Sequence, residues 1–303
     1  MKGSPDVILR KWDVLKSGIV TEFFSLLLLQ NRHFIKAVVC GNHPRMGGPT
    51  LEKLAQINPD RAFDIYKERF ADASGFTFVF VGNIDTLTIR PLLEKYLGSL
   101  PGTNSNAQFK DLGIVPVKGR IEKTVYKGRE EKATVNLVFS GEYDYTTKRM
   151  LELEALKEVL QIRILERLRE AESGVYTPQV IVSGSKYPRS VYQCQITFGC
   201  APENVENLVA STLDEIQQLK TNEPTQTLVQ KWKAEFFRTI ETQRQTNYYW
   251  LAKITSHIQN DVVFEPVDAY KDLVENISTE AIKDAANFYL SEKNYIKLVL
   301  FSE

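Results

Sequence analysis

Two side chains that could donate hydrogen bonds to a substrate lie seven residues apart in LREAESGVYTPQV, residues 168–180. Arg169 lies near the end of an amphipathic helical pattern, and Tyr176 follows a Ser-Gly pair typical of a helix end. In the ordinary interpretation, Arg169 is a cation in the last helical turn and Tyr176 is a strand-forming aromatic residue. In the functional interpretation, both donors point at one carbonyl oxygen and stabilise charge that develops on it. Arg167 ranks second as the cation, because its spacing to Tyr176 is nine residues.

The sequence contains no pattern for a self-sufficient active site. His33, His43 and His257 are its only histidines, and none belongs to an H-x-x-E-H or H-E-x-x-H motif that could hold zinc beside a general base. It also lacks a G-x-S-x-G elbow, a P-loop and a dinucleotide fingerprint. We therefore expect no catalytic residue and no metal or other cofactor in this chain.

Three cysteines are too few for a disulfide framework. Cys194 and Cys200 lie in YQCQITFGC, residues 192–200, where apolar and polar residues alternate with the period of a strand. Six residues along a strand span roughly 20 Å, too far for a disulfide bond. We expect both to be small core residues, and nothing nominates a base that would activate Cys40 or Cys200.

The composition of the 303-residue chain excludes several classes of protein. Lys plus Arg and Asp plus Glu each number 38, so the net charge is zero and no basic field favours nucleic acid. The longest apolar run, residues 23–29, is far shorter than the roughly 20 residues of a membrane span. No signal peptide is recognisable, and the cellular compartment stays open.

The elements that must position Arg169 and Tyr176 follow from apolar periodicity. Residues 147–170 carry apolar side chains at three- and four-residue steps and predict a helix. Strands are predicted at 120–126, 134–139, 175–184 and 190–199, helices from 201 and over 225–258, and a final strand at 295–300. This order predicts an α+β fold with a largely antiparallel sheet and helices on one face.

Two segments of the chain resemble each other at an offset of 220 residues. Lys11-Trp12 recurs as Lys231-Trp232, and Ile57 recurs as Ile277. A helical stretch follows in both copies, and then a short apolar strand at 76–81 or 295–300. We therefore expect tandem repeat domains, a first copy truncated at its front half (residues 1–100) and a complete copy (118–303). A Pro/Gly/Ser/Asn-rich linker is predicted at 101–117.

These residues also carry a family resemblance that extends over essentially the whole chain. YKERFADASGFTFVFVGNID, residues 66–85, followed by PLLEKYLGSLP, residues 91–101, resembles the end of a repeat domain in the pitrilysin/insulin-degrading-enzyme family of zinc metallopeptidases. LREAESGVY, residues 168–176, resembles the Arg and Tyr substrate motif in the C-terminal half of that family. The chain is similar to the last one and a half domains of a four-domain peptidase.

The resemblance implies a function that depends on a second half. Family members close two halves around a chamber, and zinc is held through H-x-x-E-H in the half that this sequence lacks. The expected function is the substrate-contacting C-terminal portion of a zinc metalloendopeptidase, with Arg169 and Tyr176 binding the peptide substrate. The expected partner is a zinc-bearing N-terminal half, in cis or on another chain. The alternative is a non-catalytic assembly or binding module on the same fold.

Overall fold

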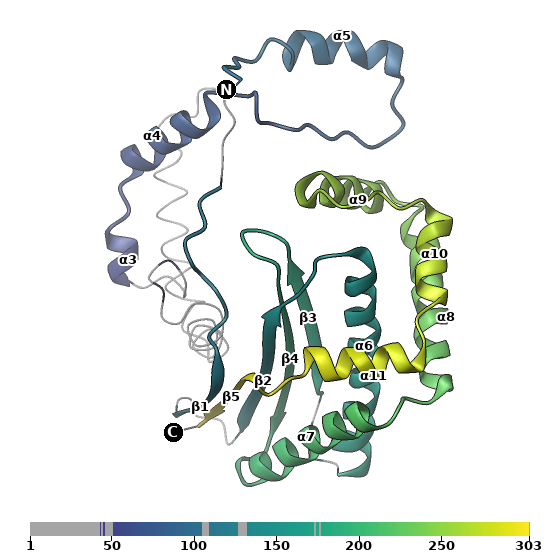
Figure 1. The fold of residues 1–303 in the computed structure, drawn as a ribbon. Coiled ribbons are helices and arrows are strands. Elements are labelled where there is room, and N and C mark those ends of the chain that lie inside the picture. The colour runs from purple at the N-terminus through teal and green to yellow at the C-terminus, as the bar shows by residue number, and fades with distance from the viewer. Residues whose placement is uncertain are drawn as a thin grey trace.

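A computed structural model describes residues 43, 45, 51–104, 109–126, 132–172, 174–175 and 177–302. Its larger part is a five-stranded sheet with helices packed against one face (Figure 1). The strands lie in the order β1 (Gly119–Tyr126), β5 (Asn294–Phe301), β2 (Ala133–Glu142), β4 (Val191–Cys200) and β3 (Gln179–Ser185). β1 and β5 are parallel, and the other neighbouring strands are antiparallel. The predicted α+β class with a largely antiparallel sheet is confirmed.

β4 shows how the sequence pattern reports burial. Its apolar residues alternate with polar ones, and each apolar side chain from Tyr192 to Cys200 is buried in the core under the helices. On the opposite face Gln195 Nε2 donates a hydrogen bond of 2.8 Å to Asn136 Oδ1 of β2. Burial raises the pKa of Cys194 to about 12 and that of Cys200 to about 11. Both thiols are free, which confirms that these cysteines are small core residues.

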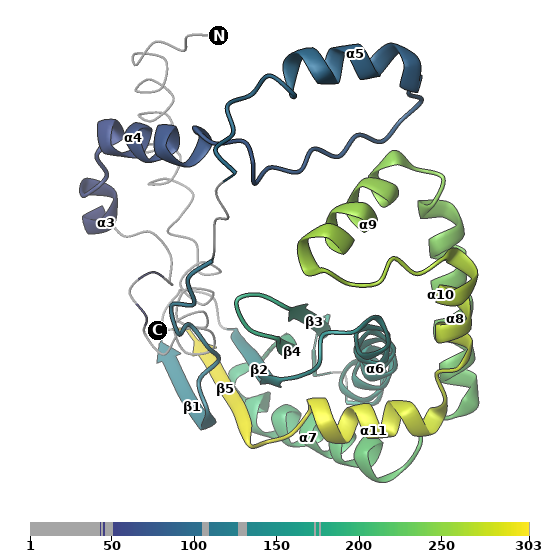
Figure 2. The same ribbon diagram turned by 45° about the horizontal axis from the view of Figure 1, so that its top comes forward.

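Three helices cover the sheet on the side of the main core: α6 (Thr147–Leu165), α7 (Val205–Thr221) and α11 (Thr279–Tyr289) (Figure 2). The stripe of α6, which includes Leu153, Leu156 and Leu160, is fully buried. A 3-10 turn, Pro202–Asn204, leads into α7 where the sequence predicts a helix start. Arg163 Nε of α6 and Glu215 Oε2 of α7 form an ion pair of 2.8 Å, which fixes the two helices together.

The predicted helix over residues 225–258 is wrong, because the chain folds there into two helices. α8 (Gln226–Gln243) and α9 (Asn247–Asn260) are separated by residues 244–246. Thr246 caps α9 by accepting a hydrogen bond from the Tyr249 amide, and Trp250 Nε1 donates to the Arg244 carbonyl at 2.8 Å. These local bonds satisfy the backbone at the break and turn the chain. α10 (Val267–Glu275) then leads to α11.

The segment predicted to be the first copy of the repeat contains α3 (Leu51–Ala55), α4 (Pro59–Phe70) and α5 (Thr86–Tyr96). The strand predicted at residues 76–81 is wrong, because this extended segment forms no ladder with any described residue. A strand needs a neighbour to accept and donate its backbone hydrogen bonds, and an apolar pattern alone does not supply one. The loop that carries this segment and α5 is closed by the Ala73 amide, which donates to the Pro101 carbonyl at 2.8 Å.

Residues of the predicted linker lie against the β3–β4 turn. Arg189 Nε donates to Asp111 Oδ2 at 2.7 Å, and the Phe109 and Tyr187 rings lie 5.4 Å apart. β1 begins directly afterwards, at Gly119. The division of the chain into residues 1–100 and 118–303 stays a prediction.

Candidate substrate-contact site

The end of α6 differs from a regular α-helix at the position of Arg169. Residues Glu166–Ala171 form a π-helical turn, in which the Glu172 amide donates to the Arg167 carbonyl at 3.2 Å. The sequence predicts an uninterrupted α-helix to residue 170. The chain is helical to that residue, as predicted, but its last turn is a π-helix and not an α-helix. Single π-helical turns are frequent at functional sites because they re-aim the side chains of a helix end.

Arg169 is exposed on this turn, while its neighbour Leu168 is fully buried in the core. Leu168 therefore fixes the turn to the domain. Arg169 has no hydrogen bond or ion pair with the described part of the chain. Its guanidinium has five N–H donors, and no acceptor in the described part of the chain occupies them.

Arg167 has a different environment and is already bound within the protein. Its Nε lies 2.8 Å from Glu172 Oε1, and this hydrogen bond raises the pKa of Arg167. Glu172 is largely shielded from solvent, since its side chain is only 20% exposed. Its second oxygen, Oε2, is buried and has no hydrogen-bond partner among the described atoms. The arrangement separates the two arginines: Arg167 holds the turn together, and Arg169 faces solvent.

Tyr176 lies outside the described residues, so its proximity to Arg169 is not established. The residues around it are placed. The Gly174 amide donates to the Leu168 carbonyl at 3.0 Å, and Val175 forms an isolated antiparallel bridge with Cys200. A Cβ on Gly174 would come within 2.7 Å of a methyl group of the buried Leu208, so only glycine fits this close approach. The strand predicted from residue 175 begins instead at Gln179.

A glutamine that the sequence does not single out closes the loop between α6 and β3. Gln161 Nε2 donates to the Pro178 carbonyl at 3.0 Å, and Gln161 Oε1 accepts from the Val180 amide at 2.7 Å. These two bonds fix both ends of the segment 162–178 that carries Arg169. A polar residue on the flank of an amphipathic helix gives no sequence signal for such a contact, because the partner is seventeen residues away.

β3 is an edge strand of the sheet and follows this loop directly. Within the described residues it pairs with β4 on one side only, and Ile181 is half exposed on it. An unpaired edge can accept an extended peptide by strand addition. The described residues therefore place a free cation and a free strand edge at the two ends of one short loop.

Among the described residues, no cluster of three or more His, Cys, Asp and Glu side chains could hold a metal ion. His43 accepts a hydrogen bond from the Arg45 amide, and His257 contacts the Val262 carbonyl through Nδ1. His33 and Cys40 lie outside the part that the structure describes. The same part contains no helix with the length and hydropathy that crossing a membrane requires.

Comparison with known proteins places this fold in a family. The family model described as "Peptidase M16 inactive domain" matches residues 56–236. A zinc protease PQQL-like protein of Arabidopsis thaliana is 28% identical over 226 residues, which cover 70% of this chain and 24% of that protein.

Solved structures of the family share the fold. The periplasmic protease PqqL of Escherichia coli matches with a TM-score of 0.79 at 18% identity, covering 96% of this chain and 33% of that one. A peptidase M16 inactive domain from Pseudomonas fluorescens matches with a TM-score of 0.80 at 13% identity, covering 100% and 72%. The chain thus spans about a quarter of the plant relative and a third of the bacterial protease. Because the family model covers more than half of the sequence, the chain belongs to the M16 peptidase family through its inactive domain, which confirms the resemblance to pitrilysin-like zinc metallopeptidases.

Proposed function

We propose that this chain is the C-terminal, substrate-contacting portion of a zinc metalloendopeptidase and acts only with a zinc-bearing half, in cis or on another chain. The match to an M16 inactive domain supports this, as do relatives named zinc proteases that are several times longer. The observation that carries the proposal is the contrast between the two arginines of the π-helical turn. Arg167 is ion-paired, whereas Arg169 is exposed and has no partner in the described part of the chain.

In this proposal the chain supplies donors and the other half supplies the metal. Arg169 and Tyr176 hydrogen-bond the peptide near the scissile carbonyl, and they stabilise negative charge that develops on its oxygen. The chemistry that a zinc ion would supply from the other half is polarisation of that carbonyl and activation of water. The free edge of β3 offers backbone groups that align an extended peptide beside the two side chains.

The test is steady-state hydrolysis of a peptide by the complex or fusion with the zinc half. We expect Arg169→Ala and Tyr176→Phe to lower kcat/KM by about one to three orders of magnitude, the loss typical of one charge-stabilising donor. Their melting temperatures should stay within a few degrees of the wild type, since neither change removes core packing.

Two control variants separate catalysis from folding. Arg238→Ala removes an exposed helical arginine whose ion-pair partner, Glu235, lies three residues away on the same helix, and it should leave both turnover and stability unchanged. Arg167→Ala leaves the half-buried Glu172 without its ion pair, so it should lower the melting temperature but not the turnover of each folded molecule. Wild-type kcat/KM in both the Arg169 and Tyr176 variants would contradict the assignment of these residues to substrate contact.

A second candidate function is a non-catalytic binding module. The observation that favours it is the apolar surface of the first copy, where the large side chains Phe63, Tyr66, Phe70, Phe76 and Phe78 are all exposed. Their rings contact one another in sequence, stacked along α4 and edge-on in the following segment, with successive ring centres 4.7–6.3 Å apart. A module of this kind would bind its partner without any effect of Arg169 or Tyr176 on peptide hydrolysis.

A further inference from the structure

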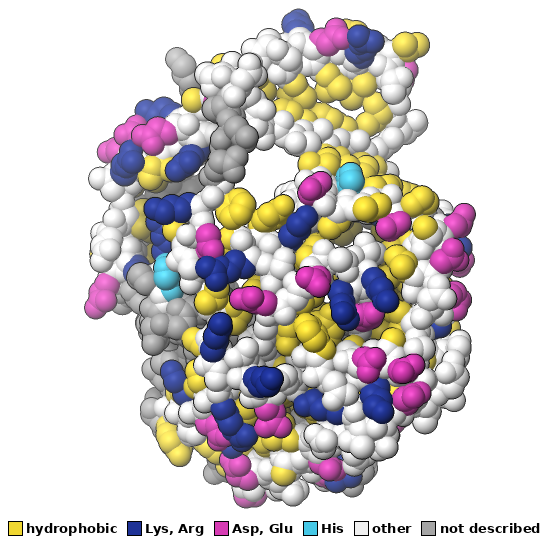
Figure 3. Space-filling model, in the orientation of Figure 1, with side chains coloured by type: hydrophobic (Ala, Val, Ile, Leu, Met, Phe, Trp, Pro, Cys, Tyr) yellow, Lys and Arg dark blue, Asp and Glu magenta, His cyan; other side chains and the backbone are white. Residues whose placement is uncertain are grey.

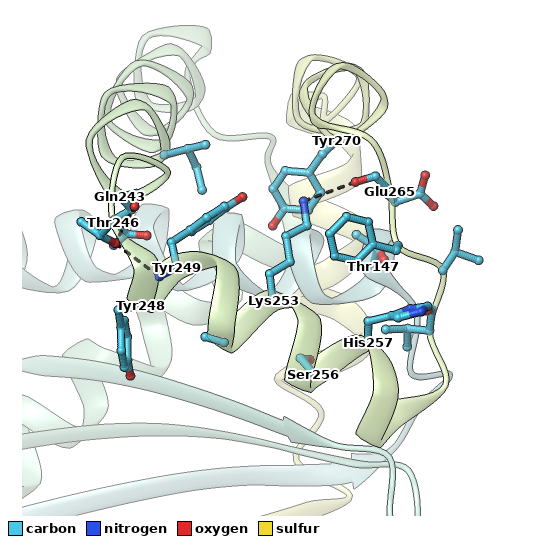
Figure 4. Close-up of a pocket in the computed structure, with 15 residues that line it drawn as sticks. Thr147, Gln243, Thr246, Tyr248, Tyr249, Lys253, Ser256, His257, Glu265 and Tyr270 are labelled. Atoms are coloured by element: carbon cyan, nitrogen blue, oxygen red, sulfur yellow. Dashed lines mark hydrogen bonds between the residues drawn. The ribbon is translucent and has the colours of Figure 1, made fainter. Parts of the chain in front are cut away.

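A pocket of about 370 Å³ lies among α9, α10 and the loop 261–266 that joins them (Figure 4). Thr147, at the first turn of α6, contributes to its wall. Arg169 follows the last turn of the same helix, roughly 30 Å away at about 1.5 Å per residue. The pocket is therefore separate from the proposed substrate-contact site.

Lys253 extends from α9 into this pocket, and aromatic rings surround its ammonium group. Nζ lies 5.0 Å from the ring centre of Tyr270, 5.2 Å from that of Phe264 and 5.8 Å from that of Tyr249. Figure 4 shows the amine between Tyr249 of α9 and Tyr270 of α10, and Phe264 belongs to the loop. The negative ring faces attract the cation and hold it in place.

The ammonium group has hydrogen-bonding capacity that the protein does not use. Of its three donors, one reaches the Glu265 carbonyl at 3.3 Å. No carboxylate of the described chain lies within ion-pair distance of Nζ, and the carboxylate of Glu265, which lines the pocket, is directed away from the ammonium group (Figure 4). Burial lowers the pKa of Lys253, because the charged form has lost part of its water and the nearby Glu265 charge offsets this loss only in part.

The walls of the pocket offer apolar contact and neutral polar groups. Burial raises the pKa of Tyr270 to about 12 and also raises the pKa of Tyr249, so both phenols are uncharged at neutral pH. His257 packs edge-on against Phe264 and contacts the Val262 carbonyl through Nδ1. Since a carbonyl only accepts, Nδ1 carries the proton, and this bond fixes the loop that forms one wall.

We propose that this pocket binds a carboxylate carried on an apolar group. Such a ligand supplies the counter-charge and the acceptors that Lys253 lacks, and its apolar group packs against Phe264 and Tyr270. The volume suits a group of this size, since small-molecule sites begin at about 300 Å³. The chemistry is shared by the C-terminal residue of a peptide and by a free aromatic acid.

Titration of the full chain with paired probes tests the proposal. N-acetyl-L-phenylalanine and its amide share an apolar body and differ in the carboxylate. We expect the acid to bind about tenfold or more tightly than the amide, because the charged hydrogen bond to Lys253 is lost in the latter. Titration with 3-phenylpropionate separates the two sources of ligand: tighter binding of the acetylated amino acid favours a peptide terminus, and the reverse favours a free acid. Equal binding of acid and amide, or no binding of the acid at millimolar concentration, overturns the proposal.

Variants locate the site. Lys253→Met keeps the apolar stem and removes the charge, and it should abolish the preference for the acid over the amide. Lys67→Met is the matched control, because Lys67 also lies over an aromatic ring, 4.9 Å from the Phe63 ring centre, but outside the pocket. An unchanged preference in Lys253→Met would contradict the assignment. If that variant fails to fold, the acid–amide comparison on the wild-type chain still decides.

Discussion

The two segments that the sequence predicts to be copies of one repeat contain helices at matching positions and bury them very differently. α10 and α11 lie 220 residues after α3 and α4, and the helix caps coincide: Asn58 accepts from the amide three residues later, and so does Ser278. Ile57 and Ile277, which precede these caps, are the same residue at the same position. Ile277 is 4% exposed in the main core, whereas Ile57 is 43% exposed.

The apolar segment that ends each copy shows the same contrast. β5 lies between β1 and β2 and is hydrogen-bonded on both sides. Its counterpart, residues 76–81, has no strand neighbour in the described part of the chain, and Phe76, Phe78 and Phe80 are each at least 40% exposed. Figure 3 shows hydrophobic side chains gathered around this part of the molecule. The difference teaches that local sequence sets the helices and their caps, whereas the burial of a central strand depends on neighbours. We expect a partner segment or self-association to cover the exposed face.

The largest expected difference between the copies is in protease sensitivity. Limited trypsin digestion should cut the exposed Lys and Arg sites of residues 51–110 orders of magnitude faster than those of the sheet domain, because few buried contacts oppose local opening there. A resistant fragment of about residues 115–303 should remain, identified by mass spectrometry. Equal protection of residues 51–100 in a monomer would contradict this view of the first copy.

A smaller effect is expected from one matched pair of substitutions. Ile277→Ala removes a buried side chain and should lower the free energy of unfolding by about 2–5 kcal/mol. Ile57→Ala removes the same atoms from an exposed position and should change it by less than about 1 kcal/mol. Urea denaturation of both variants measures the difference. Similar losses would mean that the first copy has a core of its own.

Helices and strands that are marked by the periodicity of neighbouring residues could be predicted from the sequence. They include most elements of the sheet domain. The alternation in β4 reports burial residue by residue, so the faces of Cys194 and Cys200 follow from it. The break between α8 and α9 carries no Gly or Pro, and the Thr246 cap lies within an otherwise helical pattern, so the sequence suggests one helix. The prediction of a strand at 76–81 is wrong for a different reason. The segment has the apolar pattern of a strand, but no described residue pairs with it.

The candidate site is predictable only in part. Spacing ranks Arg169 above Arg167, and the structure shows that Glu172 binds Arg167 across a π-helical turn, whereas the role of Arg169 stays a prediction. No sequence pattern reports that turn or the Gln161 contacts that close the loop. The Lys253 pocket could not be predicted from the sequence either, because its aromatic rings come from two helices and a loop and meet only in the folded chain. Tyr176 stays a prediction.

Reconstitution of activity tests the central claim most directly. The chain alone, the separately purified zinc-bearing half alone, and an equimolar mixture of the two are assayed with a fluorogenic peptide, with and without a chelator. The account predicts no hydrolysis by the chain alone, and chelator-sensitive hydrolysis by the mixture that exceeds the zinc half by at least about one order of magnitude, as expected when charge-stabilising donors are added. Chelator-sensitive hydrolysis by the chain alone, or a mixture no faster than the zinc half by itself, would contradict it.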